Sequence, residues 1–185
     1  MAEYSLRLPL RAEDVQMLRA GDTAFLTGEI YTGRDAAHKR LAALLDAGQP
    51  LPIDLKGQTI YYVGPAPAAP GHAVGSAGPT TSYRMDAYTP RLLEMGLRGM
   101  IGKGMRDEAV QKAMQRYGAV YFGAVGGAAA LISRSIKKSE VIAYPDLGPE
   151  AIHRFTIENF PVIVLMDAHG GNLYVSGPAR YAQVE

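Results

Sequence analysis

The chain has 185 residues, of which 48% are hydrophobic, and this length is sufficient for one sizeable core but short for two. Its 19 lysines and arginines nearly balance 18 aspartates and glutamates, so the net charge of +1 indicates neither a nucleic-acid partner nor a membrane surface. Cysteine is absent, which excludes a disulfide framework, a thiol nucleophile and a thiolate-bound metal cluster within this sequence.

No segment has the pattern of a membrane anchor or a secretion signal. Residues 160–166 form one of the longest apolar runs, yet they are far too few to span a bilayer, and the first residues lack the apolar core of a signal peptide. The four histidines are scattered and do not indicate a metal site. We therefore expect a soluble cytoplasmic protein that forms a single domain over residues 1–185.

Strand and helix patterns alternate along most of the chain. In chain order, the sequence predicts a strand at residues 4–10, a helix at 11–18, a strand at 21–33, a helix at 35–47, a buried strand that runs into a proline and glycine loop within 58–68, a helix at 89–95, a strand at 98–104, a helix at 106–118, a strand at 119–127, a helix at 128–136 and a strand at 139–148. This alternation predicts an α/β domain. The alanine, proline and glycine segment at residues 65–78 is interpreted as a surface loop rather than a linker.

The pattern is less regular toward the C-terminus. Residues 149–159 are predicted to be partly helical, and residues 160–178 to form two strands joined at Gly170 and Gly171.

Cations and hydroxyl groups follow the central predicted strands. Arg34 comes after the second strand, and the run Thr80, Thr81, Ser82 and Arg84 comes after the third. Lys103 follows residues 99–102 at the end of the fourth, just before a helix. A cation at a helix N-terminus is mildly unfavourable, whereas a bound anion would be stabilised there by both the free N–H groups and the cation. If these strands are parallel, their carboxyl ends converge on one ligand crevice. The pattern therefore indicates a site for a small dianion or a dicarboxylate.

Each of these residues also has an ordinary structural interpretation, which the sequence leaves open. Arg34 is also explained by a pair with Asp35 or with another surface acid, and Arg84 by a surface pair with Asp86. The three hydroxyl residues fit the cap of the next helix. Lys103 is explained by a solvated loop lysine, and the Gly126–Gly127 pair by close packing or a turn. His38 is explained by a surface position or by a supporting position beside a site.

Two familiar nucleotide-binding motifs are not present. The stretch around Lys103 lacks the first glycine and the final serine or threonine of a P-loop, and no G-x-G-x-x-G stands at a strand-to-helix turn with a downstream acid. No Ser-His-Asp set can be assigned from the sequence either.

Four stretches resemble a known family. They are TGEIYTGRDAAHKRL, VGSAGPTTSYRMDAYTPRLLEMGLRGMIGKG, VYFGAVGGAAAL and DLGPEAI, and they are similar to the β subunit of class I, iron–sulfur-dependent fumarate hydratases and to the related L-tartrate dehydratase β subunit. The resemblance runs from about residue 6 to residue 174. It implies a swivelling β/β/α three-layer domain with a mixed central sheet.

The resemblance also implies roles for individual residues. The catalytic threonine of the family falls on Thr80, its substrate-clamping arginines on Arg34 and Arg84, and its active-site lysine on Lys103. Thr81 and Ser82 remain binding or capping candidates. From the residue chemistry alone, Thr80 is a positioning hydrogen-bond donor, because an unperturbed hydroxyl is a weak base.

The resemblance places the cofactor and part of the site on another chain. It implies a [4Fe–4S] cluster held by a cluster-bearing α subunit, with none bound by this chain, and a small dicarboxylate substrate. The activity implied is the reversible hydration of fumarate to (S)-malate. Two alternatives remain, an L-tartrate dehydratase β subunit and a non-catalytic anion-binding module. A homodimer of the isolated chain is also left open.

Overall fold

The computed structural model describes residues 1–124 and 129–181. The strands are β1 (Glu3–Arg7), β2 (Thr23–Thr32), β3 (Thr59–Tyr61), β4 (Gly99–Gly102), β5 (Val120–Ala124), β6 (Ile136–Ala143) and β7 (Ile152–Met166). The α-helices are α1 (Ala12–Met17), α2 (Asp35–Asp46), α3 (Thr89–Glu94), α4 (Glu108–Tyr117), α5 (Ala129–Ser135) and α6 (Leu173–Tyr181), and two short 3-10 helices are η1 (Ser82–Met85) and η2 (Pro145–Glu150). These elements confirm the predicted α/β class.

One mixed sheet organises the molecule. Its strand order is β1-β2-β3-β4-β5-β7-β6, and β7 also pairs with β2. Strands β1 to β5 run parallel to their neighbours, whereas β7 is antiparallel to β2, β5 and β6. The second pairing of β7 closes β2, β3, β4, β5 and β7 into a ring. The mixed sheet was expected, but its closure was not.

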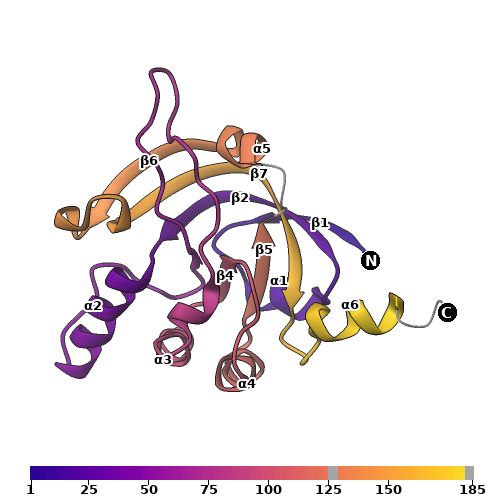
Figure 1. Ribbon diagram of the computed structural model, residues 1–185. Helices are drawn as coiled ribbons and strands as arrows, with labels where there is room; N and C mark the ends of the chain where they lie inside the picture. The colour runs from indigo at the N-terminus through magenta and orange to yellow at the C-terminus, as the bar shows by residue number, and fades with distance from the viewer. Residues whose placement is uncertain (125–128, 182–185) are drawn as a thin grey trace.

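The core lies on both faces of the ring strands. Tyr61, Ile101 and Phe122 belong to one buried cluster, and their sequence neighbours Met100 and Tyr121 belong to the other. Successive side chains of a strand point to opposite faces, so these short strands must be apolar on both sides. Helices α2, α3 and α4 cover the face that carries the second cluster, as Figure 1 shows.

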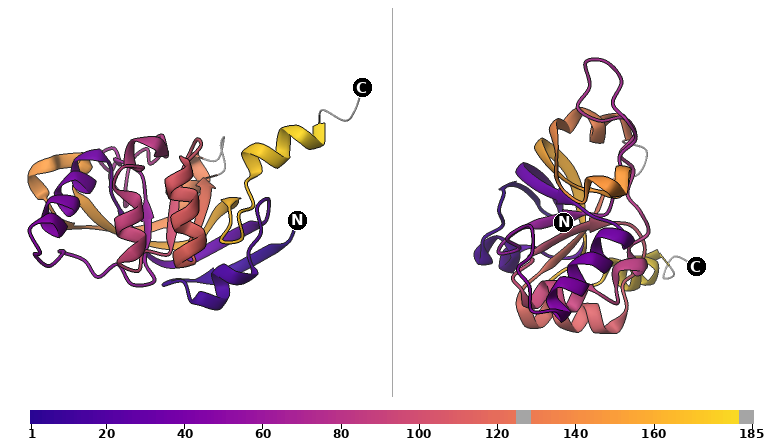
Figure 2. Two further views of the ribbon diagram at one scale, coloured as in Figure 1. Left: turned by 90° about the horizontal axis from the view of Figure 1, so that it is seen from below. Right: turned by 90° about the vertical axis from the view of Figure 1, so that its left-hand side faces the viewer.

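The helix ends follow ordinary sequence signals. Helix α4 begins where the Asp107 side chain accepts a hydrogen bond from the Val110 N–H, and it ends at Gly118 in the left-handed conformation. Pro90 lies in the first turn of α3, as predicted. Residues 64–79 project from the sheet as a long loop, which confirms the predicted surface loop (Figures 1 and 2).

Two predictions near the C-terminus were wrong. Of residues 149–159, predicted to be partly helical, only Pro149 and Glu150 lie in a helix, η2, and those from Ile152 onward belong to the 15-residue strand β7. Residues 173–181 form helix α6 instead of a second strand. Only Met166 and Asn172 pair across the turn that contains Gly170 and Gly171. Strand β7 is stabilised by partners on both sides, which a local reading of its irregular pattern does not reveal. Among the described residues, every helix is too short or too polar to cross a bilayer.

Candidate functional site

The carboxyl ends of the parallel strands meet at one edge of the sheet. Thr32 of β2 pairs with Tyr61 of β3, which in turn pairs with Ile101 of β4. The chain leaves these strands toward Arg34 and Lys103, so the segments after β2, β3 and β4 begin side by side. Strand β5 ends at the same edge, but the Gly126–Gly127 pair that follows it lies outside the described residues.

The hydroxyl residues return to this edge after the long loop. The Thr80 N–H donates to the Tyr62 carbonyl oxygen at 2.7 Å, which brings Thr80 back to the end of β3. Thr81 pairs with Lys103 in a parallel bridge. Thr80 and Thr81 are half-buried and Lys103 is exposed. The structure therefore brings together two hydroxyls and a lysine that lie more than 20 positions apart in the chain.

Ser82 faces the interior. Its Oγ lies 2.8 Å from the Tyr121 hydroxyl, which donates to the Gly104 carbonyl oxygen at 2.8 Å. Burial raises the pKa of Tyr121, so this phenol keeps its proton. A Cβ added at Gly102 would lie 2.0 Å from Ser82 Oγ, so only glycine leaves room for Ser82 here. The Ser82 hydroxyl connects the segment after β3 to the segment after β4.

The capping interpretation of the hydroxyl triplet has no support in the geometry. Thr81 stands at the N-cap of η1, but its side chain accepts no hydrogen bond from the helix. The Thr81 hydroxyl therefore has no capping role in η1.

The two arginines do not pair with the acids nearest to them in sequence. Arg34 Nε lies 3.5 Å from Glu150 Oε1, and Arg84 Nη1 lies 3.8 Å from Asp35 Oδ2. Both pairs are long, and the Arg84 side chain is 47% exposed. Exposed pairs of this length contribute little to stability. The Arg84 guanidinium group can therefore exchange this contact for a ligand carboxylate. The Arg34 side chain is only 29% exposed, and its Nε atom is buried without a hydrogen-bond partner among the described residues.

Glycine and histidine set the position of Arg34. A Cβ added at Gly64 would lie 3.0 Å from Arg34 Nη1, so the arginine lies against the backbone that follows β3. His38 Nδ1 donates to the Arg34 carbonyl oxygen at 2.8 Å. His38 is fully buried, which excludes the surface role that the sequence left open, and burial lowers its pKa to about 4. It is therefore neutral near pH 7 and supports the start of α2.

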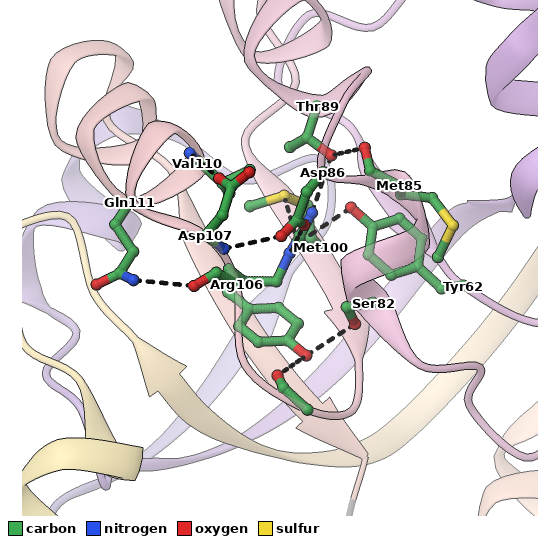
Figure 3. Close-up of polar contacts among 12 residues, drawn as sticks. Tyr62, Ser82, Met85, Asp86, Thr89, Met100, Arg106, Asp107, Val110 and Gln111 are labelled. Carbon is green, nitrogen blue, oxygen red and sulfur yellow. Dashed lines mark hydrogen bonds and ion pairs between the residues drawn. The ribbon is translucent and has the colours of Figure 1, made fainter.

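Sequence reasoning did not select Arg106. Its side chain is buried, and Arg106 Nε lies 2.6 Å from Asp86 Oδ1, so Asp86 pairs with Arg106 instead of Arg84 (Figure 3). Asp86 is itself buried, and a buried carboxylate needs a partner of opposite charge. Arg106 lies 20 positions after Asp86 in the sequence, so no local pattern predicts that the two residues pair.

The donor set of this chain does not fit an iron–sulfur cluster. The sequence has no cysteine, and among residues 1–124 and 129–181 no three histidine, aspartate or glutamate side chains come together as metal ligands. What the edge offers is three cations and two half-buried hydroxyls on an open surface, a combination suited to carboxylate groups.

Comparison with known proteins places the chain in a family. The family model described as "Fumarase C-terminus" matches residues 2–177. A class I anaerobic fumarate hydratase of Escherichia coli (strain K12) is 44% identical over 151 residues, which are 80% of this chain and 28% of that protein. A putative class I fumarate hydratase of Geobacillus stearothermophilus is 35% identical over 175 residues, 92% of this chain and 33% of that protein.

A shorter relative matches from end to end. A putative L(+)-tartrate dehydratase subunit beta of Methanocaldococcus jannaschii is 37% identical over 178 residues, 93% of this chain and 91% of that protein. The chain thus spans only about a quarter to a third of the fumarate hydratases that it matches, but nearly all of a dehydratase subunit. From the match to the family model over residues 2–177, the chain belongs to the fumarase C-terminus family.

Proposed function

We propose that this chain is the β subunit of an iron–sulfur hydro-lyase that reversibly hydrates fumarate to (S)-malate, in a site shared with a cluster-bearing α subunit. One observation carries the proposal, namely that the segments with Arg34, Thr80, Arg84 and Lys103 follow three adjacent strand ends at one edge of the sheet, where the first two residues are half-buried and the last two exposed. In this proposal the cluster belongs entirely to the partner, and the roles below concern only the residues of this chain.

The cations bind the two carboxylates of the substrate. Arg34 and Arg84 each present a planar fork of N–H donors that matches a carboxylate, and Lys103 adds a compact charge. When the C3 proton of malate leaves, negative charge builds up on the adjacent carboxylate. Cations already fixed around that carboxylate stabilise the developing charge at no cost of reorganisation. The same contacts orient the substrate for reaction.

Thr80 relays the proton at C3. In the dehydration direction its hydroxyl passes its own proton to a carboxylate of the partner and takes the proton from C3. The C2–O bond breaks, and the hydroxyl of C2 leaves into the partner's part of the site, where it combines with the released proton as water; hydration reverses these transfers. A threonine hydroxyl needs such a neighbour, because it is a weak base by itself. Thr81 contacts the substrate beside Lys103, whereas Ser82, whose hydroxyl is bonded to Tyr121, holds the segment in position.

The test is reconstitution with the partner under anaerobic conditions. We expect the chain alone to be inactive and the assembled enzyme to convert malate to fumarate. The ultraviolet absorbance of fumarate measures the conversion. Full activity of this chain alone would refute the proposal. Binding of a dicarboxylate without turnover in the assembled enzyme would support the anion-binding module instead.

An L-tartrate dehydratase subunit is the second candidate. It is favoured by the subunit of M. jannaschii, which this chain matches over 91% of that protein's length. The deciding measurement is kcat/KM of the assembled enzyme for malate and for L-tartrate, with oxaloacetate as the product of the second reaction. A higher value for L-tartrate would replace the fumarate assignment.

A further inference from the structure

A single buried arginine connects the segments that carry Arg84 and Lys103. The Arg106 side chain is 0% exposed. It follows Lys103 by three positions, and its Nε lies 2.6 Å from an oxygen of Asp86, which follows Arg84 by two. The second Asp86 oxygen accepts the Asp107 N–H at 2.8 Å. The Asp86 carboxylate therefore clamps the segment after β4 onto the end of η1 (Figure 3).

The same guanidinium group also contacts the ends of the neighbouring elements. Arg106 Nη1 donates to the Tyr62 hydroxyl at 3.2 Å, and Nη2 donates to Thr89 Oγ1 at 2.9 Å. Its Cζ lies 5.2 Å from the ring centroid of Tyr62 and 5.0 Å from that of Tyr121. One planar group thus contacts the residue that follows β3, together with β5, α3 and the residue that follows η1.

The two tyrosine contacts lead to residues of the candidate site. The Tyr62 carbonyl oxygen accepts the Thr80 N–H, and the Tyr121 hydroxyl is bonded to Ser82 and to the Gly104 carbonyl oxygen. Together with the Asp86 clamp, these contacts form a framework beneath the exposed edge. They set how far the backbone of Arg84 lies from that of Lys103.

A buried ion pair is weak evidence for a role in stability alone. Apolar side chains of similar volume often replace such pairs without loss of stability. A fork of five donors, by contrast, fixes several partners in one plane, which lysine cannot do. We propose that Arg106 is a positioning residue that sets the spacing of the substrate-binding cations. This inference rests on the proposed function, because it assigns the framework to the binding of two carboxylates.

The first readout is amide hydrogen exchange in the full chain, which requires no activity. Arg106→Lys and Asp86→Asn are compared with Val15→Ala, which truncates a buried side chain in α1. Helix α1 adjoins the opposite edge, where the Leu10 N–H donates to the Gly57 carbonyl oxygen before β3 begins. In Arg106→Lys and Asp86→Asn, we expect the amides of Ser82 and Asp107 to exchange at least about tenfold faster than in the wild type, beyond any change in the exchange rates of the β3 amides. In Val15→Ala, the exchange rates of these two amides should change only as much as those of β3.

The second readout is the KM of the assembled enzyme. A misplacement of about 1 Å can cost up to about a hundredfold in rate, so we expect KM to rise at least about tenfold in Arg106→Lys and Asp86→Asn. We expect a smaller change in kcat per folded site, and an unchanged KM in Val15→Ala. Two variants on opposite sides of the ion pair keep the test valid if one of them fails to fold.

The outcomes separate the two proposals. Unchanged exchange at Ser82 and Asp107 overturns the positioning role whatever the activity. Faster exchange with an unchanged KM in an active enzyme overturns its link to substrate binding. Faster exchange together with a raised KM supports the inference. If the assembled wild-type enzyme turns over neither malate nor L-tartrate, the proposed function fails, while faster local exchange still supports Arg106 as the residue that holds these segments together.

Discussion

Single residues at the edge differ in how much the fold depends on them. Arg84 makes one long, half-exposed contact with Asp35, so its charge is nearly free for another use. Arg106 has no exposed side-chain surface and four polar partners. The difference follows from desolvation, because a buried charge must be fully bonded whereas an exposed one is solvated by water.

Arg84→Ala should therefore impair function much more than folding. We expect kcat/KM of the assembled enzyme to fall by about 100-fold or more, since a preorganised cation at the developing charge is lost. The free energy of unfolding should change by less than about 0.5 kcal/mol. Steady-state kinetics and urea unfolding measure the two effects.

Arg91→Ala is the matched control, because Arg91 of α3 forms an exposed ion pair with Asp46 of α2. It should leave both quantities nearly unchanged. A large loss of stability in Arg84→Ala, with normal kcat in the folded fraction, would make Arg84 a structural residue instead.

His38 should make the stability of the chain depend on pH. Its pKa is about 4 in the folded state and 6.5 ordinarily, so between these values the unfolded chain binds more protons. The free energy of unfolding therefore rises with pH in this window. The contribution of the neutral His38 to it is fully present above about pH 6.5 and is lost as the pH falls toward 4. From pH 7 to pH 5 the loss due to His38 is about 2 kcal/mol.

Urea unfolding of the wild type and of His38→Gln at the two pH values measures this loss. The decrease in stability should be about 2 kcal/mol smaller in the variant. His72→Gln, which changes an exposed histidine, should behave as the wild type. Equal pH dependence in wild type and His38→Gln would contradict the buried, neutral state of His38.

At the scale of elements, the candidate site depends on how closely the segment after β3 approaches β4. Thr81 pairs with Lys103, and the Ser82 N–H donates to the Lys103 carbonyl oxygen at 2.9 Å. Such an approach requires that β4 end in a residue without a side chain. Gly102 meets that requirement, since an added Cβ would overlap Ser82 Oγ.

Gly102→Ala should disturb this junction directly. We expect a loss of about 1–3 kcal/mol in the free energy of unfolding from overpacking, together with reduced kcat/KM, because Ser82 must move and Thr80 and Thr81 move with it. Thermal unfolding and kinetics of the assembled enzyme provide the measurements. Gly177→Ala, where an added Cβ meets no atom within 4 Å, is the control and should be neutral or slightly stabilising.

At the scale of the whole molecule, β7 joins parts of the chain that are distant in sequence. It pairs with β2, β5 and β6, and its Phe160 is fully buried with its ring centroid 5.5 Å from that of Tyr61. The closed ring therefore depends on contacts between the beginning, the middle and the end of the chain. Loss of one central side chain should weaken all of it together.

Phe160→Ala should accordingly lower the free energy of unfolding by about 3–5 kcal/mol. Circular dichroism and tyrosine fluorescence should still report one coincident transition. Val175→Ala, on the exposed surface of α6, should change stability by less than about 0.5 kcal/mol. Two separate transitions in Phe160→Ala would show that the ring does not unfold as a unit.

The sequence by itself determined the elements whose signals are local. Helices α2 and α4, strand β2 and the projecting loop were predicted because helical periodicity, end signals and glycine or proline content act within a few residues. The candidate cations were found in the same way, by their place after successive strands. The convergence of these cations required the strands to be parallel, which the sequence could not establish. The structure shows that they are parallel, so their ends meet.

Only the tertiary structure decided what depends on distant partners. Strand β7 is one long strand because it pairs on both sides, although its own pattern resembles a helix in part. Asp86 pairs with Arg106 rather than Arg84, because the turn after β4 brings that guanidinium group within bonding distance. The physical reason is the same in both cases: packing and ion-pair energies depend on separation in space, which a chain sets only when it is folded.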